Sequence, residues 1–237
     1  MKLAMMQPYF FPYLGYFSLI KHSDFFILSD NVQYINKGWI NRNRILKQNQ
    51  GFMYINVPLI KHSSTEIIKN IEIDNNVEWQ DKILKNLLHY KRKAPFFNDT
   101  MNVIKEIFTC KTNSITILKE KALKFVCDYI DIPFNHGIYS ELNLKTQSVN
   151  APDEWALKVA LELGYDEYIN PPGGVEIYDK NKYQKHNLKL TFLKNNLPFY
   201  SQRRGENFFE NGLSIIDVMM FNSPKTIREM LDDNELI

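Results

Sequence analysis

The first thirty residues constrain the fold more than any other part of the chain. Lys2 to Met6 is a short apolar run that ends at Gln7-Pro8, and Phe25 to Ser29 is a second one. Between them, Tyr13 to Lys21 places its apolar residues on one side of a helix. Strand, loop, helix and strand in this order are typical of a parallel βαβ unit. The sequence therefore predicts an α/β fold with a mostly parallel sheet.

The remainder of the 237 residues predicts a single α/β domain over 1–237 with a helical insertion. Strong helical patterns gather between about 77 and 131. They cover Val77 to Lys91, Phe96 to Phe108 and Ile115 to Ile130. Outside this segment we expect strands at Phe52 to Pro58, Ile67 to Ile73, Tyr165 to Asn170 and Leu188 to Leu193, and helices at Ala151 to Leu163, at LSIIDVMMFN (213–222) and from Pro224.

Composition excludes several classes of protein. A net charge of +2 without a dense basic stripe argues against a nucleic-acid partner. The chain has no apolar stretch of about 18 residues and no signal-peptide core, so we expect a cytoplasmic protein without membrane insertion. Cys110 and Cys127 lack a C-x-x-C pattern, and no histidine pair has metal-ligand spacing, so we predict reduced thiols and no metal site. No cofactor can be assigned.

The loop after the first strand is the first candidate site. It reads QPYFFPY (residues 7–13), and Gln7, Tyr9 and Tyr13 are its candidate substrate-binding residues. In a parallel α/β unit this loop lies at the carboxyl end of a strand, where ligands bind. A helix beginning near Tyr13 would point its free N–H groups at such a ligand. The alternative is that the rings are simply core residues.

A polar segment with two aromatic residues follows the second predicted strand, DNVQYINKGWINRNR (residues 30–44). Its amide and carboxylate groups suit sugar hydroxyls, its rings suit the apolar face of a sugar, and Arg42 or Lys37 could meet a diphosphate. The alternative is a solvated surface loop. The candidate residues of this segment are Asp30, Gln33, Lys37, Trp39, Asn41 and Arg42.

Three further segments carry candidate residues. His62 lies in a predicted loop, KHSS, and could act as a general base near neutral pH. The turn INPPGG offers the backbone of Gly173 and Gly174 at a strand end, although a plain turn is the simpler reading. The segment YSQRRGENF (200–208) contributes Gln202 beside two arginines. No G-x-S-x-G, Walker loop or G-x-G-x-x-G occurs, so a covalent serine or cysteine mechanism has no sequence support.

The opening layout loosely resembles the topology of HIGH-motif nucleotidyltransferases. Those enzymes have two histidines flanking a glycine near the helix start, whereas this chain has Tyr13 and Tyr16 around Gly15. No histidine is therefore available there to hold the phosphates of a nucleotide. The resemblance favours the topology and counts against adenylyl transfer by that mechanism.

Several motifs together resemble the WbqC-like family of bacterial proteins: QPYFFPYLGYF, SDNVQYINKGWINRNRI, VPLIKHSS, YKRKAPFF, YINPPGG and LSIIDVMMFN. The family is named after surface-polysaccharide gene clusters, so the resemblance implies a role in O-antigen, lipopolysaccharide or other glycan biosynthesis. It implies a transferase that modifies a nucleotide-linked amino sugar, for example by moving an acyl or aminoacyl group to the sugar amine. The donor would be a small molecule or a carrier-bound group.

Such a transfer needs a base for the attacking amine and donors for the carbonyl oxyanion. By residue type and position, Asp30 and His62 are the candidate catalytic bases, and Asn41, Gln33 or a backbone N–H is the candidate oxyanion donor. Two other functions stay open. One is a nucleotidyltransferase that uses a nucleoside triphosphate, and the other is a non-catalytic nucleotide-sugar binding or scaffold protein.

Overall fold

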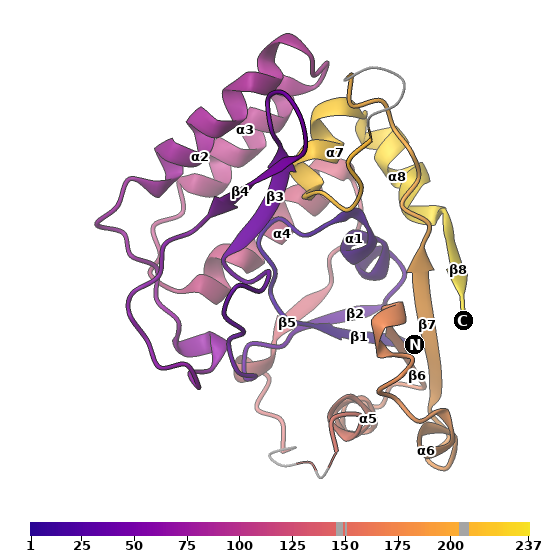
Figure 1. Cartoon of the computed structure of the whole chain (residues 1–237). Coiled ribbons are helices and arrows are strands. Elements are labelled where there is room, and N and C mark those ends of the chain that lie inside the picture. The colour runs from indigo at the N-terminus through magenta and orange to yellow at the C-terminus, as the bar shows by residue number, and fades with distance from the viewer. Residues whose placement is uncertain (146–148, 150, 204–208) are drawn as a thin grey trace.

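The computed structural model describes all residues except 146–148, 150 and 204–208, and it is built on one central sheet (Figure 1). The strand order is β5-β2-β1-β6-β7-β8. All neighbours are parallel except β7 and β8, which are antiparallel. The six strands are β1 (Lys2–Met6), β2 (Phe25–Leu28), β5 (His136–Ile138), β6 (Glu167–Asn170), β7 (Lys189–Asn195) and β8 (Asn234–Leu236). The predicted α/β fold with a mostly parallel sheet is confirmed.

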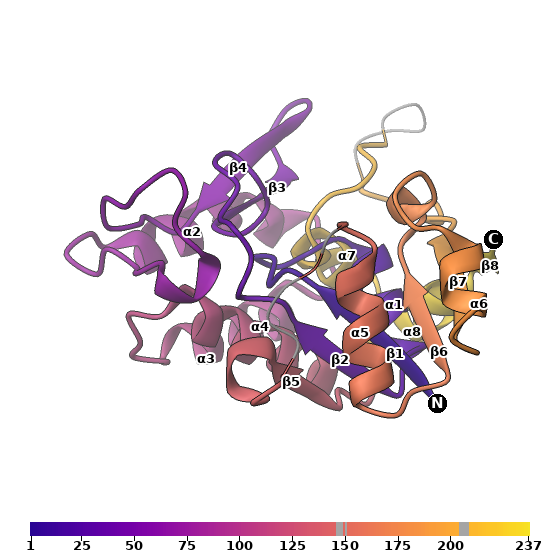
Figure 2. The same cartoon turned by 90° about the horizontal axis from the view of Figure 1, so that it is seen from below.

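The sheet has helices on both faces (Figure 2). The α-helices are α1 (Leu14–Lys21), α2 (Trp79–Leu87), α3 (Phe97–Phe108), α4 (Ile115–Ile130), α5 (Glu154–Glu162), α6 (Lys180–Gln184), α7 (Ile215–Phe221) and α8 (Pro224–Asp232). Helices α1, α4 and α8 pack on one face, whereas α5 and α6 cover the other. The described residues also form short 3-10 turns: η1 (Ile68–Asn70), η2 (Leu88–Arg92), η3 (Tyr139–Glu141) and η4 (Pro172–Gly174). Within the described residues, no helix combines the length and the apolar character that crossing a membrane requires.

Successive side chains of the central strands point to opposite faces of the sheet, and most of the apolar residues on each face are buried. Ala4 and Phe26 belong to the core beneath α1 and α4, whereas Leu3 and Ile27 belong to the core beneath α5. The paired register, with Leu3 opposite Phe25 and Ala4 opposite Phe26, keeps like-facing residues together. Strands buried on both faces read as continuous apolar runs, which is what made β1 and β2 recognisable.

Two segments differ from expectation. The segment Ile67 to Ile73 is predicted as a strand but contains η1, because its residues pair singly with three different partners: Ile67 with Gln33, Glu72 with Ser114 and Ile73 with Leu59. Conversely, the polar segment after β2 contains a strand, β3 (Arg42–Leu46), which pairs antiparallel with β4 (Phe52–Asn56). Its residues Asn43 and Ile45 are buried, whereas Arg42 and Arg44, which alternate with them, are half-buried.

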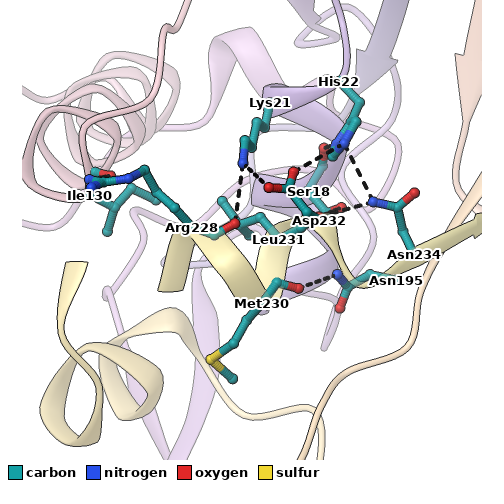
Figure 3. A network of polar contacts seen from close by, with 10 residues as sticks. All are labelled: Ser18, Lys21, His22, Ile130, Asn195, Arg228, Met230, Leu231, Asp232 and Asn234. Carbon is teal, nitrogen blue, oxygen red and sulfur yellow. Dashed lines mark hydrogen bonds and ion pairs between the residues drawn. The ribbon is translucent and has the colours of Figure 1, made fainter. Parts of the chain in front are cut away.

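The last turn of α8 is capped by side chains from distant elements (Figure 3). A helix leaves its final carbonyl groups without partners. Here Ser18 Oγ donates to Leu231 O at 2.7 Å, Lys21 Nζ donates to Arg228 O at 3.2 Å, and Asn195 Nδ2 donates to Met230 O at 2.9 Å. The network ties α8 to α1 and β7, which lie far from it in sequence.

Removing the Ser18 hydroxyl tests this cap. Ser18→Ala should lower the free energy of unfolding by about 1 kcal/mol, because a buried carbonyl loses its shortest donor. Ser23→Ala is the matched control, since the Ser23 hydroxyl donates only to Ile20 O within the same helix region and is half-buried. Urea denaturation measures both variants. If Ser18→Ala and Ser23→Ala lower the free energy of unfolding equally, Ser18 has no special role in capping α8.

Lys119 of α4 is buried in the core without a charged partner. Its side chain is fully inaccessible, and its Nζ has no hydrogen-bond partner among the residues that the structure describes. The Nζ lies 4.2 Å from the centre of the Phe10 ring. Desolvation lowers the pKa of this amine well below its usual value. A ring face attracts the charged amine, but such contacts offset only a part of the cost of complete burial. Burial therefore favours the neutral amine more strongly in the folded protein than in the unfolded chain.

Replacing Lys119 by methionine should stabilise the fold. Because the folded pKa lies below the unfolded one, the native state releases its proton first, and stability should rise with pH towards about 10.4, the ordinary lysine value. Lys119→Met should raise the free energy of unfolding at pH 7 by about 1–3 kcal/mol and abolish this rise. Thermal unfolding across pH measures both effects. Lys121→Met, on the same helix and less buried, is the control, and a destabilised Lys119→Met would contradict the assignment.

Candidate functional site

The order of the strands reverses at β1 and β6. The chain first places β2 on one side of β1, and it later places β6 and then β7 on the other side of β1. At such a point, the loops leaving the carboxyl ends of neighbouring strands run in opposite directions and leave a crevice that binds ligands in open α/β sheets. A cavity of about 410 Å³ lies there, lined by the ends of β1 and β6, by Ser29 after β2 and by the start of α5. We take this switch-point cavity as the candidate site.

The side chains that line the cavity are uncharged. Most are apolar or aromatic, and three are polar: Gln7, Ser29 and Asn170. Burial raises the pKa of Tyr9 and Tyr178, so both hydroxyls are neutral at physiological pH. The aromatic members of the lining are Tyr9, Trp155, Tyr168 and Tyr178. Such a composition, aromatic walls with a few amide and hydroxyl groups, is that of a small-molecule site.

The loop 7–13, which we call the hook, is held by hydrogen bonds to its own carbonyl groups. Asn43 Nδ2 donates to Phe10 O at 2.9 Å and to Phe11 O at 2.8 Å, and Ser214 Oγ donates to Phe11 O at 2.8 Å. These bonds fix Phe11 at a φ of 41°, in the left-handed region that L-residues rarely adopt. They come from β3 and from the start of α7, so two distant segments shape the hook.

The hook divides its rings between core and cavity. Phe10 and Phe11 are buried, whereas Tyr9 and Tyr13 are half-buried. Tyr9 lines the cavity, and Tyr13 packs its ring over Gly15 at the start of α1. Tyr16 is fully buried, and its hydroxyl donates to Gln7 O at 2.9 Å, which sets the backbone next to the Gln7 side chain.

The turn after β6 forms the opposite wall. Asn170 accepts a hydrogen bond from the Tyr168 hydroxyl at 3.1 Å, and its Nδ2 donates to Pro171 O at 3.1 Å. Gly174 lies directly against this amide: a Cβ atom there would come within 2.0 Å of Asn170 Nδ2 and 3.0 Å of the Tyr178 ring. A Cβ atom on Gly173 would meet nothing within 4 Å, because Gly173 faces open space.

Asp30 lies beside the cavity, one residue after the lining residue Ser29. Its side chain is buried, and its two carboxylate oxygens accept from Ser140 N at 3.0 Å and from Ser140 Oγ at 2.7 Å. Ser140 follows β5, the sheet neighbour of β2. The carboxylate therefore links the ends of two strands at the same edge of the sheet as the cavity.

A second group of the predicted residues gathers around Tyr34, which we call the Tyr34 cluster. The His62 ring lies edge-on to the Tyr34 ring, with 4.9 Å between centres, and the Tyr34 hydroxyl donates to Asn41 Oδ1 at 2.8 Å. His62 Nδ1 contacts Ser63 O at 2.9 Å. Because a carbonyl only accepts, this contact places the proton on Nδ1 and leaves the Nε2 lone pair for another proton. Gln33 Nε2 donates to Ser64 O at 2.9 Å on the same loop.

Lys37 and Trp39 lie in the loop before β3, and Arg42 is the first residue of β3; all three lie outside the lining of the cavity. The Arg42 guanidinium donates to Gly38 O and to Lys37 O and lies over the Tyr54 ring at 4.3 Å. The hairpin segment still touches the hook, because Phe10 N donates to Trp39 O at 2.9 Å. The two segments that the sequence singled out are thus in direct contact, with the cavity on one side and the hairpin on the other.

Gln202 belongs to a separate buried network. Its Nε2 lies 3.2 Å from Asp217 Oδ2, and the hydroxyls of Tyr90 and Tyr200 each donate to the Asp217 carboxylate at 2.6 Å. Burial, followed by the Asp217 charge, raises the pKa of both tyrosines. This network lies outside the cavity lining and holds α7 against β3, since Tyr90 OH also accepts from Leu46 N at 2.9 Å. Arg204, which follows Gln202 closely, lies outside the described residues.

The lining residues that the sequence did not single out include the aromatic residues Trp155, Tyr168 and Tyr178 and the polar residue Asn170. Asn170 carried a usable signal, since a polar residue closes an apolar strand just before PPGG. Trp155 stands in the first turn of α5 and looked like one more apolar position of an amphipathic helix. Among the described residues, no three His, Cys, Asp or Glu side chains are grouped as a metal site would need.

These features define a doubly wound α/β protein with a neutral, aromatic-lined cavity at its switch point. The chain belongs to the WbqC-like protein family, whose sequence profile matches residues 7–229. It is similar to an uncharacterized protein of Mycobacterium tuberculosis, Rv1507c, with 26% identity over 227 residues and 93% of each chain covered. No solved structure matches the chain, so the likeness to HIGH-motif nucleotidyltransferases stays a prediction.

The two adjacent glycines of the turn should respond differently to the same added methyl group. Gly174→Ala should lower the free energy of unfolding by about 1–3 kcal/mol, because the methyl collides with the Asn170 amide and the Tyr178 ring. Gly173→Ala, its matched control, should leave stability within about 0.5 kcal/mol of wild type. Differential scanning calorimetry measures both. Equal stability of the two variants would contradict the packing of this wall.

Proposed function

We propose that the protein is a transferase of glycan biosynthesis that moves an acyl or aminoacyl group to the amine of a nucleotide-linked amino sugar. The observation that carries the proposal is the switch-point cavity, where uncharged aromatic walls and convergent amide groups meet beside a buried carboxylate. Membership of the WbqC-like family supports a role in the pathway after which that family is named.

The cavity suits the sugar itself. A pyranose ring presents apolar C–H faces and polar hydroxyl edges, so it needs aromatic surfaces with hydrogen-bonding groups at the rim. Tyr9 and Trp155 supply the surfaces, and Gln7 and Asn170 supply the hydrogen-bonding groups. The open space over Gly173 lets a ligand approach the backbone closely.

The phosphates of the nucleotide need a different place, because the cavity lining holds no cation. Lys37 and Arg42, on the segment that contacts the hook, are the basic groups assigned to the diphosphate. Lys37 is exposed, and its ammonium is open to an anion. Arg42 keeps guanidinium N–H groups beyond the two that bind Gly38 O and Lys37 O.

The sugar amine attacks the carbonyl of the thioester donor, so a C–N bond forms and the C–S bond breaks. The amine loses a proton to a base, and the departing thiolate takes up a proton to leave as the thiol. His62 is the better disposed base, since its Nε2 lone pair is the one left by the contact with Ser63 O. Asp30 favours a positive charge on the attacking amine before that proton leaves. Asn41 and Gln33 each use one amide N–H on a backbone carbonyl and keep a second one for the oxyanion that forms.

Direct incubation tests the proposal. The protein is mixed with candidate nucleotide amino sugars and acyl or aminoacyl thioester donors, and mass spectrometry looks for the sugar bearing the transferred group. A thermal-shift screen of nucleotide sugars selects the acceptors beforehand, because a ligand that binds the native state raises its melting temperature. Gly173→Ala should weaken that shift without changing the melting temperature of the free protein.

Two substitutions test the catalytic roles. His62→Ala should lower kcat/KM by about 100-fold or more, the usual contribution of a general base. Asp30→Asn should lower it as well while the fold survives, because asparagine can keep the bonds to Ser140. His186→Ala, at an exposed histidine, is the control and should match wild type. Full activity in both Asp30→Asn and His62→Ala would remove these residues from the mechanism.

Nucleotidyl transfer is tested by incubation with a nucleoside triphosphate and magnesium, with pyrophosphate release as the readout. The arrangement of Tyr16 argues against it. Tyr16 is fully buried and its hydroxyl is bonded to Gln7 O, so it cannot hold phosphates as a histidine of the HIGH motif does. Binding of a nucleotide sugar without turnover of any donor would favour the non-catalytic alternative.

A further inference from the structure

A second concave surface lies between α2 and α3, on the other side of the molecule from α5 and α6 (Figures 1 and 2). It has a volume of about 450 Å³. Its floor is apolar and consists of Leu84 and Leu88 on the α2 side and of Phe97 and Met101 on α3. Leu88 of this lining is 53% exposed. We call this surface the lysine groove, for the residues at its rim.

The rim of the lysine groove is basic on both sides. Lys85 and Lys91 stand on the α2 side and Lys105 on the α3 side, and Asp81 is the acidic side chain in its lining. The segment 79–112 that builds the groove has seven Lys or Arg against three Asp or Glu, while the whole chain is nearly balanced. Positive charge is thus concentrated here, far from the switch-point cavity.

We infer that the lysine groove docks an acidic amphipathic helix of a small carrier protein. A helix of this kind lays its apolar residues into a hydrophobic groove and keeps its charged residues at the edges. Leu88 and Leu84 would receive the apolar residues, since Leu88 is exposed and Leu84 is half-buried in the lining. Lysines on both edges would pair with carboxylates that flank the apolar stripe of the helix.

The shape of the groove favours a helix over other anionic partners. Nucleic acid is bound through stacking rings and phosphate contacts, but the groove floor is mostly aliphatic and its one aromatic side chain, Phe97, is buried. A membrane surface is flat, whereas this surface is concave and its most exposed apolar side chain lies between lysines. The identification of the partner as a carrier rests on the proposed acyl or aminoacyl transfer, but the docking itself does not.

Binding is tested with a bacterial acyl carrier protein bearing its phosphopantetheine group, immobilised for biolayer interferometry. Wild-type protein should bind in a salt-sensitive way, and the triple variant Lys85→Glu, Lys91→Glu, Lys105→Glu should lose about tenfold or more in affinity. The matched control reverses three other exposed lysines, Lys47, Lys145 and Lys185, and should retain wild-type affinity. Failure of the wild type to bind, or equal losses in the two triple variants, overturns the proposal.

A second variant pair tests the apolar floor. Leu88→Asp should also lose about tenfold or more, whereas Leu161→Asp, at an exposed leucine of α5, should bind as wild type does. Both positions are exposed, so the fold should survive, and circular dichroism checks it. A vesicle of phosphatidylglycerol and phosphatidylcholine serves as the competing probe. If it binds and the carrier does not, the groove is a membrane site and the proposal is wrong.

Activity separates this proposal from the proposed function. With a soluble acyl-coenzyme A donor, the Lys85, Lys91 and Lys105 variant should retain wild-type turnover, because the groove lies outside the catalytic residues. With the carrier-bound donor it should lose turnover in parallel with binding. If the protein binds the carrier but transfers no group from any donor, the proposed transferase function is wrong and the docking proposal stands. If it transfers a group from acyl-coenzyme A but does not bind the carrier, the docking proposal is wrong and the transferase function stands.

Discussion

The position of β1 between two parallel neighbours is the constraint on which the rest of the structure depends. Because β2 lies on one side and β6 on the other, the loops leaving β1 and β6 diverge and cannot pack against each other. The space between them is the cavity, and its walls are the hook and the turn over Gly174. A different strand order built from the same strands would close this space.

The hook is an unusual backbone held by distant groups. Phe11 adopts a left-handed conformation, and the carbonyl groups exposed by that bend are satisfied by Asn43 and Ser214. Such strain persists only where the surroundings over-determine it. The backbone conformation of the hook therefore depends on both the hairpin and α7. The Asp217 network holds these same two elements together.

The surfaces named in the proposals differ in charge. The cavity lining is neutral and Asp30 is buried beside it, whereas the hairpin segment and the lysine groove each carry exposed lysines. A neutral sugar, an anionic nucleotide and an acidic carrier would each meet a surface of matching chemistry. The distribution also explains why a net charge of +2 concealed the basic segment at 79–112.

The sequence by itself determined the secondary structure of the central unit and of the helical segment. Apolar runs buried on both faces marked β1 and β2, and α4 (Ile115–Ile130) began and ended where its periodicity did, because burial imposes a pattern on neighbouring residues. It also marked Gln7, Tyr9, Gly173 and Gly174, which share the cavity lining. Only the tertiary structure decided which polar residues meet. Asn170 and Trp155 joined the lining, whereas Gln202 turned towards Asp217, because contacts between distant segments leave no periodic trace in the chain.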